Sequence, residues 1–364
     1  MSDHRYPAER TGSVEETAVP LAGPNPPSHL GTDSSASLDQ WRGLALVLVL
    51  VSHGFFHTNR VHGIGRVGVN LFFFISGVLV YRSLSRQEQK PAWDRTRSFW
   101  WRRFRRLFPA LMAYVVAMTP VVYFGQNLSG LPPRSSFVDY LRAVPVALTY
   151  LVNFWTAEAP LSLGHLWSLA CEMQFYLLGP LIHTAGGRSS ARRHVVWGGL
   201  LLLLMGLGVT QPLFGAETKY YFQFAVWPMM LGFFCEYKKP WLNQLPRRLS
   251  LVTAWGGVAL FVASTVLMLY GIGMKKLVIA SGALVLIPCF AFYSAGCPIP
   301  GLPGRILLWL GERTYSIYLW QQPLTICGFL PMVLRPLGAA FSAVIGGLWF
   351  RFFEWPFLSV SRRK

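Results

Sequence analysis

Two residues of one apolar stretch, Arg42 and His53, have the types and the spacing to do chemistry. They occur in "LDQWRGLALVLVLVSHGFF", residues 38–56, where the arginine lies near the start and the imidazole lies inside the run. In a helix, eleven residues make three turns plus about 20°, so both share a face, about 16 Å apart along the axis. If Arg42 lies at a membrane surface, His53 lies near the middle of a hydrocarbon core about 30 Å thick. An ionisable group there indicates a functional site, and a neutral histidine bonded to a neighbouring helix is the alternative.

His57 follows His53 at the i+4 spacing of a zinc-binding pair. No acidic residue or cysteine lies nearby in the sequence, so we expect no metal. The five cysteines are scattered and odd in number, and they indicate neither a disulfide framework nor a metal site.

The stretch "FWWRRFRRLFP" groups four arginines with aromatic residues. Arginine forks match phosphate oxygens, which favours a polyphosphate site, but the same residues could anchor the chain to anionic lipids. The sequence favours neither interpretation over the other. The four arginines are Arg102, Arg103, Arg105 and Arg106.

A carboxylate occurs deep in another apolar stretch, "LGHLWSLACEMQFYLLGPL". His165, Ser168 and Glu172 share one helical face there, and a carboxylate at that depth needs a partner. Two interpretations of Glu172 are open: a structural pair with an arginine or a histidine, and a role in a functional site. In "GRVGVNLFFFISGVLVY", Asn70 and Ser76 could line a site, whereas the glycines are expected to allow close helix packing.

Polar residues also occur in "GERTYSIYLWQQP" and "FRFFEWPF" near the end of the chain. They lie at or near the ends of apolar blocks, where such residues are more often anchors and caps than catalysts. They are Glu312, Arg313, Gln321, Gln322 and Glu354.

The elements that must position these residues are predicted to be transmembrane helices. The 364 residues are 53% hydrophobic and only 13% charged, with a mean hydropathy of +0.39, and the apolar residues form long blocks. The sequence therefore predicts an all-α polytopic membrane protein of about ten transmembrane helices. The predicted spans are residues 44–58, 66–82, 106–124, 165–184, 194–212, 219–235, 250–271, 277–294, 314–331 and 334–352.

The net charge of +18 lies mostly in short segments between these blocks, as in cytoplasmic loops, so we expect no nucleic-acid partner. If the weaker block 137–155 does not cross the membrane, all the strongly basic segments lie on the cytoplasmic side, and so do both termini. If it does cross, they do not all lie on one side. We therefore expect this block not to cross but to lie in the outer interface or re-enter the membrane. We expect residues 1–37 to be a disordered cytoplasmic tail, 38–357 the transmembrane domain and 358–364 a basic cytoplasmic tail.

The order of these motifs resembles the acyltransferase family 3 membrane O-acyltransferases, over about residues 38–357. The residues that match the family's elements are Arg42 and His53 (Arg-x10-His), Arg102 to Arg106 (the basic element), Ser76 and Gly77 (SG), and Trp167, Ser168 and Glu172 (WSLxxE). "LGERTYSIYLWQQP" and "FFEWP" extend the match. One departure is Gln321, where many relatives have a histidine after "YLW".

The resemblance implies transfer of an acyl group, acetyl above all, from cytoplasmic acyl-CoA to a hydroxyl of a carbohydrate or glycoside, such as O-antigen, exopolysaccharide or another cell-surface glycan. It implies a multi-pass protein of the bacterial inner (plasma) membrane, in contact with membrane lipids. No SGNH-type esterase domain follows the last predicted helix, so we expect a stand-alone transferase. A polytopic transporter or lipid-binding membrane protein without covalent chemistry is the alternative.

An alcohol attacks a thioester slowly, so a base that takes its proton in the transition state accelerates transfer. The resemblance gives that role to His53, although attack by His53 itself, giving an acyl-imidazole, stays open. Arg42 completes the motif, and Glu172 is expected to orient His53 or the acceptor hydroxyl. The basic element would hold the phosphates of the donor, and Asn70, Ser76, His165 and Ser168 are candidates for the substrate site.

Overall fold

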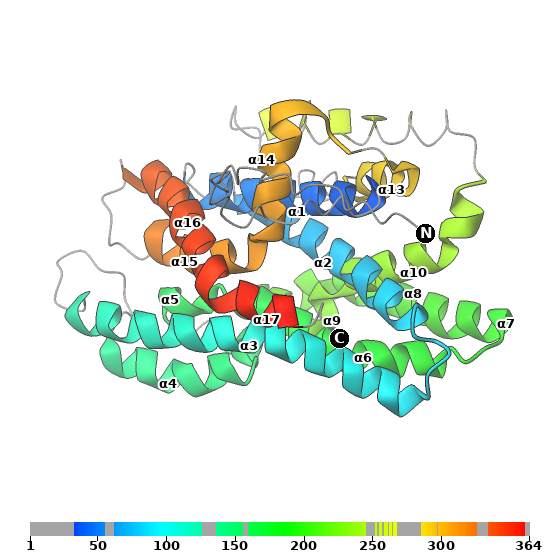
Figure 1. The fold of residues 1–364 in the computed structure, drawn as a ribbon, viewed down its shortest axis with the longest axis horizontal. Helices are drawn as coiled ribbons and strands as arrows, with labels where there is room; N and C mark the ends of the chain where they lie inside the picture. The colour runs from blue at the N-terminus through cyan, green and yellow to red at the C-terminus, as the bar shows by residue number, and fades with distance from the viewer. Residues whose placement is uncertain are drawn as a thin grey trace, which may run out of the picture.

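Every regular element that the computed structural model describes is a helix, as the composition predicts (Figure 1). The structure describes residues 33–54, 62–125, 136–155, 159–244, 285–296, 298–325 and 334–360, and scattered positions between 252 and 267. Parts of the predicted spans 250–271 and 277–294, most of the two predicted tails, and His57 lie outside these residues. The longer helices are α1 (Asp33–Gly54), α2 (His62–Ser85), α3 (Ala92–Gly125), α4 (Phe137–Leu148), α6 (Trp167–Ala185), α8 (Gly199–Thr210), α10 (Trp227–Leu242), α13 (Leu286–Ala295), α14 (Gly301–Glu312), α15 (Thr314–Thr325) and α16 (Arg335–Trp349).

Short helical turns connect or extend these helices. Two of them, η2 and η6, are π-helical turns, a form that is often found at functional sites. The short elements are η1 (Val152–Phe154), α5 (Leu161–Gly164), α7 (Ser190–Arg193), η2 (His194–Gly198), η3 (Gln211–Phe214), η4 (Ala216–Tyr220), α9 (Phe222–Ala225), η6 (Phe350–Glu354) and α17 (Trp355–Val360).

Four of the described helical stretches are long and apolar enough to cross a membrane: 64–85, 92–125, 190–214 and 335–358. Large apolar side chains point outward from the bundle, among them Val195, Val209 and Leu213 at 74%, 80% and 82% exposed. Exposing so much apolar surface to water is energetically costly, whereas contact between that surface and lipid tails is not. The structure therefore agrees with an all-α membrane protein, while the number of spans and the side of the termini stay predictions.

Glycines let the central helices approach closely. A Cβ atom at Gly77 of α2 would collide with the Met229 carbonyl of α10, and one at Gly232 of α10 would collide with the Phe74 carbonyl of α2. Gly68 of α2 lies similarly close to the Ala45 carbonyl of α1. The prediction that the glycines of the second block serve packing is confirmed, and this packing fixes how α2 presents Ser76.

Helix α4 accounts for the weak block 137–155. Its twelve residues span about 18 Å, too short to cross a hydrocarbon core of about 30 Å. It lies along α3, where the Tyr140 hydroxyl donates a hydrogen bond to the Val115 carbonyl at 2.7 Å (Figure 1). After α4 the chain turns at Tyr150, whose φ is 56°, and Gln174 of α6 binds the Tyr150 carbonyl at 2.8 Å. This path favours a re-entrant segment over one that lies on the surface.

The start of the first helix is held by contacts with a distant part of the chain. Helix α1 starts at Asp33, and Ser37 is already buried, while the domain boundary at residue 38 stays a prediction. Gln40 explains why this end is ordered, because its amide binds the carbonyls of Ile299 and Gly304 and the Ile299 N–H. The start of α1 is thus tied to the segment that leads into α14.

Candidate active site

A small cavity lies between α1, α2, α3, α6 and α15. Its volume is about 50 Å³, room for roughly three waters. Phe72, Phe73 and Leu107 supply apolar parts of the wall. Six residues that the sequence identifies as site candidates line this one space: Arg42, Ser76, Arg103, Arg106, Ser168 and Glu172.

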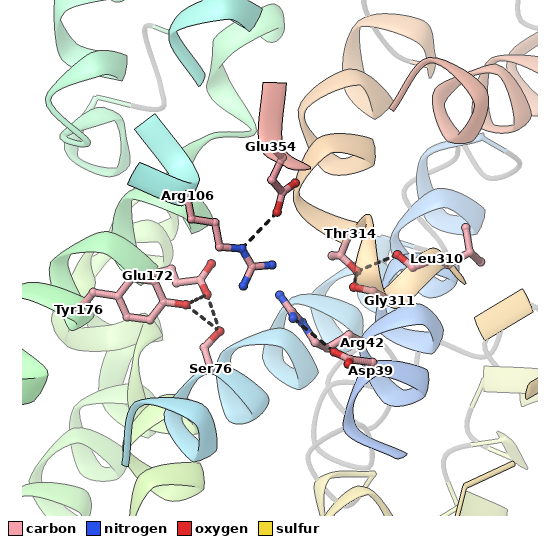
Figure 2. Close-up of polar contacts among 10 residues, drawn as sticks. All are labelled: Asp39, Arg42, Ser76, Arg106, Glu172, Tyr176, Leu310, Gly311, Thr314 and Glu354. Atoms are coloured by element: carbon pink, nitrogen blue, oxygen red, sulfur yellow. Dashed lines mark hydrogen bonds and ion pairs between the residues drawn. The ribbon is translucent and has the colours of Figure 1, made fainter. Parts of the chain in front are cut away.

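Glu172 is held by two hydroxyl groups. Its Oε1 accepts hydrogen bonds from Ser76 Oγ of α2 and from Tyr176 Oη, one turn further along α6 (Figure 2). The Tyr176 hydroxyl is also 3.5 Å from Ser76 Oγ. The partner that a carboxylate at this depth requires is thus a pair of hydroxyl groups, and the charge of Glu172 faces the cavity together with Ser76.

Arg106 forms the tightest ion pair of the site, with Glu354. The Arg106 Nε donates to Glu354 Oε1 at 3.1 Å, and Ser316 Oγ of α15 donates to Glu354 Oε2 at 2.9 Å. Glu354 is fully buried at the end of the π-helical turn η6. Figure 2 shows the guanidinium groups of Arg106 and Arg42 directed toward the same space, with Arg42 paired with Asp39 at 3.5 Å.

Arg103 differs from these two arginines. Its guanidinium stacks on the Tyr176 and Phe99 rings, 4.6 and 5.4 Å from their centroids. Among the described side chains, no carboxylate lies within ion-pair distance of it. An arginine that lines a cavity without such a partner suits a phosphate or carboxylate group.

His53 lies further along α1, outside the lining of this cavity. Its Nδ1 is 2.6 Å from Oε1 of Gln321, on the same helix as the cavity residues Thr314 and Tyr318. Arg42 and His53 thus both face α15, as their eleven-residue spacing predicts. With the Gln321 oxygen as acceptor, Nδ1 carries the proton and Nε2 is the basic nitrogen. Gln321 is fully buried.

Comparison with known proteins settles the family. A family model described as an acyltransferase domain, acyltransferase family 3, matches residues 35–360. The chain belongs to this family. It is similar to O-acetyltransferase OatA of Staphylococcus aureus (strain NCTC 8325 / PS 47), with 25% identity over 353 residues that cover 88% of this chain and 56% of that protein. It is also similar to the putative O-acetyltransferase SACOL0978 of Staphylococcus aureus (strain COL), with 24% identity over 360 residues and the same two shares.

The chain spans about half the length of these curated relatives. No solved structure matches it. The resemblance read from the motifs is thus confirmed at the level of the family, and the role of each site residue rests on the geometry of this chain.

The other two arginines of the basic element point away from the cavity. Arg102 binds Ser98 on its own helix and lies 3.4 Å from Ser83 Oγ of α2. Arg105 stacks over Trp101, an exposed ring that also stacks on Phe104. The two interpretations of the element therefore fit different faces of α3: Arg103 and Arg106 suit a phosphate site, and Arg105 with Trp101 suits contact with lipid headgroups.

The remaining candidates lie around the cavity. Ser168 Oγ is 2.7 Å from the Tyr318 hydroxyl, which also donates to the His165 carbonyl at 2.9 Å. The His165 ring binds the Leu319 carbonyl at 3.1 Å, so this histidine fixes α6 against α15. Asn70 is buried on α2. No group of three potential metal ligands occurs among the described residues.

Glu354 is expected from its position in the sequence to be an anchor or a cap, whereas in the structure it pairs with Arg106, which lines the cavity. Its one sequence signal is an acidic side chain amid aromatic residues, in "FRFFEWPF". A buried carboxylate in such surroundings requires a cationic partner, but that partner, Arg106, lies 248 residues earlier in the chain.

Proposed function

We propose that this acyltransferase moves an acyl group, in the simplest case acetyl, from acyl-CoA to a hydroxyl of a carbohydrate or glycoside, such as O-antigen, exopolysaccharide or another cell-surface glycan, at the bacterial plasma membrane. One observation carries the proposal. Three arginines of α1 and α3 converge on a cavity beside the Ser76–Glu172–Tyr176 group, in a chain of an acyltransferase family with relatives named O-acetyltransferases.

In this proposal the donor's phosphates bind Arg103 and Arg106. Guanidinium forks bind phosphate oxygens through charge-assisted hydrogen bonds, and Arg103 has no competing carboxylate at ion-pair distance among the described side chains. The cavity has room for only about three waters, so donor binding has to displace side chains or part the surrounding helices. The pantetheine arm would then run along α1 from Arg42 toward His53, about 16 Å away.

The acyl transfer follows from this placement. The acceptor oxygen forms a bond to the thioester carbon while His53 Nε2 takes its proton, and the carbon–sulfur bond breaks. The departing thiolate takes up a proton, which the imidazolium can return. In this proposal the Gln321 carbonyl oxygen accepts the Nδ1 proton, so that Nε2 is the nitrogen that acts as the base. A variant in which His53 carries the acyl group as an acyl-imidazole uses the same residues.

The deciding measurement is release of free thiol from acetyl-CoA by the purified protein with an extract of surface glycans. Acyl transfer predicts thiol release together with a gain of acetyl on the glycan, detected by mass spectrometry. Solute movement without thiol release would instead indicate a transporter, and the proposal would fail. The Arg103→Gln, Arg106→Gln double variant should weaken the binding of free CoA, whereas Arg105→Gln on the outer face of α3 serves as the matched control.

A further inference from the structure

Two basic residues, Arg66 of α2 and Lys219 of η4, are in contact at the end of α2 that is remote from the basic segment 82–106. The Arg66 Nη2 donates a hydrogen bond to the Lys219 carbonyl at 3.1 Å. The Arg66 guanidinium stacks on Trp167, 5.0 Å from the ring centroid, and the Lys219 ammonium lies 4.7 Å from the centroid of Tyr220. The two aromatic rings are themselves 4.9 Å apart.

This group is continuous with the wall of the cavity. Trp167 packs edge-on against Phe73 at 6.1 Å, and Phe73 lines the cavity. Ser168, the residue after Trp167, lines it as well. Cys171, one turn further along α6, bonds to the Tyr220 carbonyl and fixes η4 against this helix. Trp167 and its neighbour Ser168 therefore link the two basic residues to the wall of the cavity.

Neither cation has a counter-ion among the side chains that the structure describes. Arg42, Arg82, Arg106, Arg142, Arg193 and Arg313 each have a carboxylate within 4 Å, but Arg66 and Lys219 do not. Arg66 is partly buried against Trp167, where a guanidinium without a counter-ion is costly. A carboxylate or phosphate of a ligand would offset that cost and would match the planar fork of donors.

The depth of Arg66 coincides with that of His53. A Cβ atom at Gly65 would come within 2.9 Å of Ser52 Oγ, so the residues just before Arg66 and His53 lie against each other. Ser76, in contrast, is ten residues further along α2, about 15 Å from Arg66 along the axis. An anion at Arg66 thus lies level with the proposed base and far from the proposed donor phosphates.

We propose that Arg66 and Lys219 form an acceptor subsite for a carboxylate or phosphate, so that the acceptor is an anionic saccharide. This inference rests on the proposed function and deepens it by naming the charge of the acceptor. The anionic group docks on the two cations, and a neutral hydroxyl of the same saccharide is then presented at the level of His53.

The experiment measures binding of three probes to the purified protein in phosphatidylcholine nanodiscs, by calorimetry or thermal shift. The probes are methyl β-D-glucuronide, glucose 6-phosphate and the neutral methyl β-D-glucoside. We expect at least one anionic probe to bind about tenfold or more tightly than the neutral one, with a preference that falls as salt increases. Binding of the uronide alone would indicate a carboxylate-bearing acceptor, and binding of the sugar phosphate alone would indicate a phosphate-bearing acceptor.

The variants are chosen to separate charge from folding. Lys219 is exposed, so Lys219→Gln removes its charge without disturbing the core. Arg66→Lys keeps the positive charge at position 66 but removes the planar guanidinium. Arg66→Gln should abolish the preference for anions. Arg142→Gln, at an exposed position of α4 with its own partner Asp139, is the matched control and should leave the preference unchanged.

Three results would overturn the inference: equal binding of neutral and anionic probes, no binding of any probe at millimolar concentration, or an anion preference unchanged in the Arg66→Gln and Lys219→Gln variants. Loss of probe binding in nanodiscs that contain phosphatidylglycerol would assign the cations to a lipid headgroup instead and would also overturn it. Failure of the proposed function is seen separately, as an absence of thiol release from acetyl-CoA, because the binding measurement does not depend on turnover.

Discussion

Replacing Glu354 by glutamine removes the charge of this side chain and keeps its shape, which tests whether it acts through Arg106. Glu354 is fully buried and accepts two hydrogen bonds, one from Arg106 Nε at 3.1 Å and one from Ser316 Oγ at 2.9 Å. Glutamine offers one acceptor oxygen for Arg106, and its NH2 group can only donate to Ser316, whose hydroxyl must then reverse its role. The guanidinium of Arg106 loses its counter-ion, and the contact that orients it toward the cavity is weaker.

The magnitude follows from the two bonds. A hydrogen bond that involves a charged group contributes about 1.5–3 kcal/mol and a neutral one about 0.5–1.5 kcal/mol, so we expect Glu354→Gln to lower the free energy of unfolding by about 1–3 kcal/mol. Glu354→Ala leaves Arg106 unpaired and should cost about 3–5 kcal/mol. The matched control is Glu312→Gln, which removes an exposed carboxylate 3.0 Å from Arg313 and should cost less than about 1 kcal/mol.

The functional assay is the KM for acetyl-CoA in membranes with equal amounts of folded variant, measured by thiol release. We expect Glu354→Gln to raise this KM about tenfold, which corresponds to roughly 1.4 kcal/mol of donor binding. Removal of a negative charge near the donor phosphates acts in the opposite direction, so the comparison is repeated in an Arg106→Gln background. If Glu354 acts only by positioning Arg106, its replacement has no further effect on the KM there.

Additive effects of Glu354→Gln and Arg106→Gln on the KM would refute the positioning role. An unchanged KM in Glu354→Gln, together with the expected loss of stability, would reduce the pair to a structural contact between η6 and α3. A merely structural role moves the unfolding free energy without moving the KM, so the two readouts separate the explanations.

Three further predictions address the site. Arg103→Gln and Arg106→Gln should each weaken donor binding by about 1.5–3 kcal/mol, and Arg102→Gln, which faces away from the cavity, should not, as CoA titrations can show. His53→Gln should lower the rate of acyl transfer by about 10²–10⁴-fold and leave the KM for the donor nearly unchanged. The rate of the wild-type protein should fall toward acid pH, because a protonated imidazole cannot accept a proton. Near-native turnover of the variant would contradict the role of His53 as a base. Glu172→Gln should lower kcat because the negative charge beside Ser76 is lost. Native turnover in the folded variant would show that this charge has no role in catalysis.

Residue types and motif order were enough to identify several residues that line the cavity. Arg42, Ser76, Ser168 and Glu172 come from three helices, and each was identified as a polar group in an apolar stretch. Such groups are costly in a membrane, which is why each was considered a site candidate. The predicted packing role of Gly77 follows from the same logic, because only a small residue permits the approach of α10.

The sequence could not predict helical phase or long-range pairing. Arg102 and Arg105 differ from Arg103 and Arg106 only by their rotation around α3, and aromatic residues on all sides of that segment hide which face is buried. The pairing of His53 with Gln321 joins residues 268 positions apart, and no local pattern indicates it. The position of α4 also depends on its contacts with α3 rather than on its own hydropathy.

Helix α1 gives this site a fixed length. Arg42 and His53 belong to one uninterrupted helix, so their separation along the axis, about 16 Å, does not depend on loop motions. In the proposed reaction this distance separates the charged end of the donor from its thioester. Insertion of one residue between them would rotate His53 by about 100° around the axis of α1 and break its contact with Gln321. A substitution on the lipid-facing side of α1 would leave this contact in place. In the proposed reaction, the Arg-x10-His spacing therefore matches a donor whose recognised end and reacting end are far apart.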